Sequence, residues 1–159
     1  MGNVMSREVI LKEYIEMMRA YYEYILIDCM PSLGIMTINA LAASDSVIIP
    51  VQAAYLPVKG LQQLIRTISM VKKRLNRKLF FEGILLTMAD FRTNYAKDVY
   101  SRIRETYGSQ IRIFETRIPM SVKAAEASAE GISIYRHCPK NKVAVSYNNL
   151  TKEVLRYEG

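Results

Sequence analysis

Residues 24–50 read YILIDCMPSLGIMTINALAASDSVIIP, and this stretch decides the fold. Ile25, Leu26 and Ile27 form an unbroken apolar run, which is typical of a strand in a parallel sheet that helices cover on both faces. Asp28 ends the run, and a turn containing proline and glycine follows it. Because an unpaired carboxylate is costly in a core, we expect Asp28 to emerge in the crevice where open α/β sheets bind ligands.

The segments around this stretch alternate between helical and extended patterns. Apolar spacing predicts helices over residues 7–20, 35–43, 57–75, 95–107, 121–129 and 141–157. Short apolar runs predict further strands over residues 47–51, 79–87 and 111–118. We therefore expect one domain, residues 1–159, with an α/β fold: a doubly wound, mainly parallel sheet with flanking helices.

The composition favours an anionic partner. The chain carries 22 Lys and Arg against 15 Asp and Glu, a net charge of +7, which suits nucleic acid, a nucleotide or a membrane surface. No apolar run approaches the ~20 residues that span a bilayer, so we expect a cytoplasmic protein without a membrane segment. The two cysteines lie far apart and form no CxxC or Cys/His cluster, so neither a disulfide framework nor a zinc site is indicated.

Basic residues also gather locally, and two interpretations of them stay open. Five cations fall within residues 72–78, either as a solvated helix end that the helix dipole favours or as a phosphate-binding face. Arg136, Lys140 and Lys142 are further candidates for such a face. The single histidine, His137, has no acid or nucleophile beside it in sequence and is interpreted as part of a solvent-facing turn.

A buried strand that ends in Asp before a tight turn is typical of a magnesium-dependent nucleotide site. Together with LLTMADFRTN at residues 85–94 and FETRIPMSVKAAEASAEGISI at residues 114–134, the opening stretch resembles the ParA/Soj family of partition ATPases, members of the deviant Walker superfamily that includes MinD. The resemblance covers nearly the whole chain but only the C-terminal portion of the family's usual length. It implies a P-loop NTPase-like fold, ATP and magnesium as cofactors, and chromosome or plasmid partitioning as the function.

The resemblance also assigns a nucleotide site residue by residue. Asp28 matches the aspartate that holds a magnesium-bound water, and a switch loop follows it, with Met30 where proline is usual. The positions matching that loop are Pro31, Ser32 and Gly34. The positions matching the adenine pocket are Thr87, Met88 and Pro119.

For partners, the resemblance implies non-specific DNA, a ParB-type protein and a second copy of the chain, in a nucleoid-associated homodimer. Arg92 and Lys123 match the basic positions with which the family grips DNA. Arginine is the common residue at the second position, so a point charge replaces a fork that makes two hydrogen bonds. Met120 stands where the family usually has a basic residue.

The family's glycine-rich phosphate loop does not occur in these 159 residues, because none of the seven glycines begins GxxxxGK[ST]. We therefore expect no ATP hydrolysis by this chain alone, and a non-catalytic DNA- or protein-binding module is the alternative function. In the family the phosphate-loop strand pairs with the strand that carries the aspartate. Without it we expect either a rearranged sheet, in which the strands near Tyr24 and Ser46 pair with the others, or dimerisation across the open edge.

Overall fold

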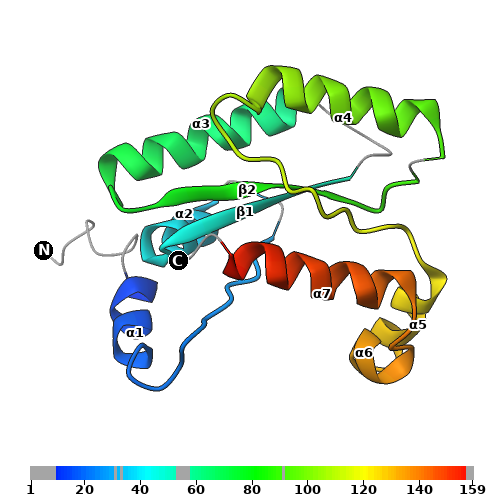
Figure 1. Ribbon diagram of the computed structural model, residues 1–159. Helices are drawn as coiled ribbons and strands as arrows, with labels where there is room; N and C mark the ends of the chain where they lie inside the picture. The colour runs from blue at the N-terminus through cyan, green and yellow to red at the C-terminus, as the bar shows by residue number, and fades with distance from the viewer. Residues whose placement is uncertain (1–9, 31, 33, 53–57, 91, 157–159) are drawn as a thin grey trace, which may run out of the picture. The chain divides into compact units, whose positions relative to one another are not determined.

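The computed structural model describes residues 10–30, 32, 34–52, 58–90 and 92–156 and confirms the α/β class (Figure 1). Its helices and strands are α1 (Ile10–Met18), α2 (Ile35–Ala43), β1 (Ser46–Gln52), α3 (Val58–Arg74), β2 (Phe80–Thr87), α4 (Asn94–Tyr107), α5 (Val122–Ala129), α6 (Ile134–His137) and α7 (Lys142–Leu155). All six predicted helices are present, whereas the single turn of α6 was not expected. Two compact units divide the chain: Met1–Val47 with Pro57–Phe81, and Ile48–Leu56 with Glu82–Gly159.

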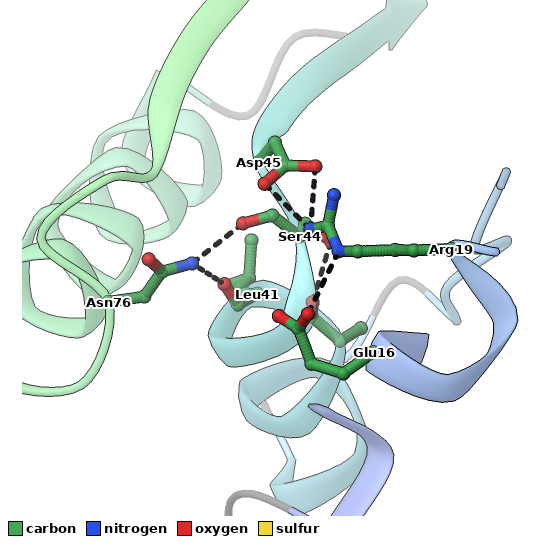
Figure 2. Close-up of polar contacts among 7 residues, drawn as sticks. Glu16, Arg19, Leu41, Ser44, Asp45 and Asn76 are labelled. Carbon is green, nitrogen blue, oxygen red and sulfur yellow. Dashed lines mark hydrogen bonds and ion pairs between the residues drawn. The ribbon is translucent and has the colours of Figure 1, made fainter. Parts of the chain in front are cut away.

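In the first unit, α2 packs against both α1 and α3. The small side chains of α2 permit this close packing, and Ala40, Leu41, Ala42 and Ala43 are all buried. Asn76, in the turn after α3, fixes the end of α2. Its amide nitrogen donates to the carbonyls of Leu41 at 3.0 Å and Ser44 at 2.6 Å (Figure 2). Carbonyl groups at the C-terminal end of a helix have no hydrogen-bond partner within the helix. The Asn76 side chain therefore caps the end of α2 and anchors the turn after α3.

The predicted strand over residues 24–27 is wrong. Residues 24–30 have no regular secondary structure and join no ladder among the described residues, and Leu26 is 96% exposed. A strand needs a neighbouring strand to complete its backbone hydrogen bonds, and no described strand pairs with residues 25–27. The rearranged sheet expected for this segment is therefore also wrong.

The second unit contains a parallel sheet. β1 pairs with β2, and β2 also bonds residues 111–119, through Ile84 N to Arg112 O at 2.8 Å and Phe114 N to Ile84 O at 3.0 Å. Since alternate residues of a strand bond to opposite sides, β2 lies between β1 and residues 111–119. The expected strand over residues 111–118 forms only isolated parallel bridges rather than a continuous ladder. β1 tolerates Pro50 because it is paired on one side only among the described strands.

Gly83 allows residues 111–119 to approach β2 closely. A Cβ added to Gly83 would meet the Phe114 ring at 2.8 Å and the Arg112 carbonyl at 3.0 Å. Phe114 is fully buried and forms a core with Leu85, Ile118 and Val143, against which Leu150 and Val154 of α7 pack. Helix α7 thereby covers one face of this sheet, and α4 lies on its other side (Figure 1).

The C-terminal turn of α7 is also held by an ionic contact. The Glu153 carboxylate accepts hydrogen bonds from the backbone amides of Glu115 at 2.8 Å and Thr116 at 2.9 Å, and it pairs with Arg112 at 3.0 Å. Arg112 also lies 3.7 Å from the buried Glu82. Burial raises the pKa of Glu153, but the hydrogen bonds from the two backbone amides, the Thr116 side chain and Arg112 together hold that pKa below its usual value.

Candidate functional site

The proposed adenine-contacting residues come together in the second unit. β2 ends at Thr87, and Met88 follows in a left-handed turn with φ of 49°. Directly after this turn, Ala89 bridges in parallel to Pro119, with Ala89 N donating to Ile118 O at 3.3 Å. The chain thus places the turn at Met88 beside Pro119, although 32 positions separate Thr87 from Pro119 in sequence.

Chemically, this turn offers an apolar face. The Met88 side chain is 49% exposed and Pro119 is half-buried. A thioether and a proline ring fit the flat apolar surface of an adenine base. These residues fit the base of the expected nucleotide.

Asp28 belongs to the first unit and is exposed. The prediction that it closes a buried strand is wrong, because that strand does not form. Its charge acts on Cys29, whose thiol pKa is raised first by burial and then by the Asp28 carboxylate. Asp28 offers one carboxylate to a magnesium ion or its water shell, and no group of three or more metal-binding side chains occurs in the part of the chain that the structure describes.

In the switch loop, Pro31 lies outside the described residues. The carbonyl of Ser32 accepts a hydrogen bond from the hydroxyl of Thr37, which is buried in α2. Gly34 is the N-cap residue of α2 and makes no side-chain cap. The described part of the loop is therefore tied to the first turn of α2.

Arg92 is already paired. Its guanidinium donates to both carboxylate oxygens of Asp90 at 2.8 Å, and its backbone amide donates to the same side chain at 3.1 Å. These hydrogen bonds lower the pKa of Asp90 to about 2 and raise that of Arg92. The side chain of Arg92 is 89% exposed, so the pair stands in water at the start of α4.

Lys123 is paired in the same way, and His137 belongs to its cluster. Lys123 Nζ lies 2.7 Å from Glu126 Oε2 on α5. His137 lies between two acids, with Nε2 3.3 Å from Glu126 and Nδ1 3.3 Å from Glu130. The interpretation of His137 as part of a solvent-facing turn is wrong, because its side chain is only 17% exposed. The four-residue spacing of Glu126 and Glu130, which places both acids on one helix face, was the available signal.

One grouping was not expected. Arg117 joins Lys140 and Lys142 around an open hollow of about 340 Å³ beside Pro119. Arg117 is held by its guanidinium, which stacks on the Tyr100 ring at 4.2 Å. The structure thus gathers two of the cations considered for a basic face with a third that sequence reasoning missed. Met120, which follows Arg117 closely in the sequence, is exposed.

Comparison with known proteins finds one matching family and several similar sequences. A family described as AAA domain matches residues 1–81. The chain is 46% identical to "Sporulation initiation inhibitor protein Soj" of Bacillus subtilis, over 94% of this chain and 58% of the relative. It is 43% identical to "Chromosome partitioning protein ParA" of Myxococcus xanthus, over 95% of this chain and 53% of the relative.

A solved structure is also similar. The cobyrinic acid a,c-diamide synthase of Mycobacterium smegmatis, with bound ATP analog and magnesium, superimposes with a TM-score of 0.82 at 31% identity, over 96% of this chain and 55% of that one. The chain therefore spans just over half the length of the proteins it matches. No helix among the described residues is long and apolar enough to cross a membrane.

Proposed function

Because the chain belongs to the family described as AAA domain and, within it, to the ParA/Soj partitioning ATPases, we propose that it acts in chromosome or plasmid segregation as a protein that binds nucleotide and DNA. The observation that carries this proposal is the likeness to Soj and ParA along almost the whole chain. The likeness to the diamide synthase is weaker in sequence, at 31% identity. We therefore place partitioning before amide synthesis.

For the nucleotide, Met88 and Pro119 would contact the adenine base and Asp28 would hold a magnesium-bound water. ATP would supply the phosphoryl group, and magnesium would neutralise its charge. Backbone amides of a glycine-rich loop normally cradle the phosphates, and the 159 residues contain no such motif. This chain alone then recognises the base rather than the phosphates and does not hydrolyse ATP.

For DNA, Arg92 and Lys123 would bind phosphates without reading the sequence. Both must exchange a carboxylate partner for a phosphate, since Asp90 and Glu126 hold them in the free protein. Exposed ion pairs are worth little in water, so this exchange costs little. The hollow lined by Arg117, Lys140 and Lys142 adds further positive charge in the same unit.

For assembly, we propose a homodimer, a ParB-type partner and a cytoplasmic, nucleoid-associated location. Residues 25–30 join no sheet among the described residues, and this supports self-association, because an apolar segment outside a sheet can add to the sheet of a second chain. Sedimentation over a concentration series tests this: a monomer at every concentration would contradict the homodimer.

A non-catalytic DNA- or protein-binding module is the second candidate function. The missing phosphate loop and the net charge of +7 favour it. The two functions differ in whether the adenine segments bind a base.

Calorimetry with ATP plus magnesium, and separately with adenosine, distinguishes the two functions. We expect both compounds to bind with similar affinity, and Met88→Asp to abolish the binding of both, since a charge replaces part of the apolar face. Val122→Asp is the matched control, because Val122 is also an exposed apolar residue of the second unit. Binding of neither compound by the original chain would leave the non-catalytic module.

A further inference from the structure

The last turn of α3 and the loop that follows it carry a second cluster of cations, outside the residues assigned above. Its five members, the basic turn, are Lys72, Lys73, Arg74, Arg77 and Lys78. All but the half-buried Lys72 are exposed. No ion pair joins any of the five to a carboxylate within the described ranges. Arg92 and Lys123, in contrast, are each held by an acid.

The basic turn is rigidly anchored. The Asn76 side chain makes its two hydrogen bonds to the end of α2 (Figure 2). In addition, the backbone N of Asn76 donates to Val71 O at 3.0 Å, and Leu79 N donates to Asn76 O at 3.1 Å. Leu79 is fully buried, and Phe80 N donates to Asp45 O at 3.1 Å. The backbone that carries the cations is therefore already ordered, so a ligand does not have to order it.

Asp45, whose backbone carbonyl accepts the hydrogen bond from Phe80 N, has its carboxylate paired with Arg19. Both oxygens of Asp45 accept from Arg19 Nη2 at 2.9 Å, and Glu16 lies 3.4 Å from the same guanidinium (Figure 2). The hydrogen bond to Asp45 raises the pKa of Arg19.

From these contacts we propose that the basic turn is a docking surface for the phosphate backbone of double-stranded DNA. This inference rests on the proposed DNA-binding function and adds a contact in the first unit to the cations of the second. Unpaired cations on an ordered backbone release counterions on binding phosphate without first breaking an ion pair. Only Leu75 and Phe80 add exposed apolar surface at the turn, which favours a charged polymer over insertion into a lipid layer.

The test is a salt titration of binding to a short random-sequence duplex, followed by fluorescence anisotropy. The variant Lys73→Gln/Arg77→Gln/Lys78→Gln removes three exposed charges from the turn. The control Lys12→Gln/Arg66→Gln/Lys152→Gln removes three exposed charges elsewhere. We expect the slope of log K against log salt to fall in magnitude by about 2 to 3 in the first variant and much less in the control.

A charge-retaining variant, Lys73→Arg/Arg77→Lys/Lys78→Arg, should keep the original slope, and circular dichroism should show that all variants fold. The inference would be overturned if the turn variant and the control gave equal slopes while Arg92→Ala/Lys123→Ala lost binding. The proposed function would then still stand. No DNA binding by the original chain would overturn both. Binding to phosphatidylglycerol vesicles that the turn variant loses, without DNA binding, would identify a membrane surface instead.

Discussion

Two segments of similar sequence have opposite fates in this protein. Residues 24–27 read YILI and residues 84–87 read ILLT, and both patterns predict a buried strand. Leu26 is 96% exposed, whereas Leu86 is fully buried in β2. The second segment is paired on both sides, whereas residues 25–27 of the first join no described strand or bridge. Apolar composition therefore makes a strand possible, and a partner makes it form.

The sharpest way to test this contrast is to truncate the same side chain in both segments. We expect Leu86→Ala to reduce the free energy of unfolding by about 2–5 kcal/mol, because it leaves a cavity in a packed core. Leu26→Ala should change it by less than about 0.5 kcal/mol, since its side chain is already in water. Urea denaturation of both variants measures the difference. Equal losses would show that residues 24–27 are packed in solution.

In a second pair of substitutions, each glycine is replaced by alanine, which adds a methyl group instead of truncating a side chain. Gly83→Ala forces a Cβ against Phe114 and the Arg112 carbonyl, and we expect a loss of about 1–3 kcal/mol as residues 111–119 move away. At Gly34, beside the unpaired segment, the nearest atom to an added Cβ is Ser32 Oγ at 3.7 Å. Gly34→Ala should cost less than about 1 kcal/mol, from alanine's weaker N-cap preference. The reverse order in thermal denaturation would contradict the close approach.

The smallest expected change in stability comes from replacing one carboxylate near each segment, Glu153 or Asp28, and it depends on pH. Glu153→Gln should cost about 1–2 kcal/mol at neutral pH, because the charged acceptor for two amides is lost. Since folding lowers the pKa of Glu153, its contribution is complete above the usual value of 4.5 and disappears as the pH falls through the folded-state value. Asp28→Asn, in the unpaired segment, should leave stability unchanged. A Glu153→Gln deficit that persists in strong acid would contradict this assignment.

The sequence by itself determined six of the helices, the strands β1 and β2, the basic charge and the family resemblance. Helical and strand periodicities are local properties, so the boundaries of α2 match the predicted residues 35–43. The resemblance at residues 85–94 matched Met88 to an adenine pocket, and in the structure the turn at Met88 lies beside Pro119.

Only the tertiary structure decided which groups are paired. It left residues 25–27 outside the described sheet, joined Arg92 and Lys123 to local acids, and placed His137 between Glu126 and Glu130. It also paired the Asp45 carboxylate with Arg19. Strand pairing and charge neutralisation both depend on what lies within a few ångströms, and residues far apart in the chain supply many of these contacts.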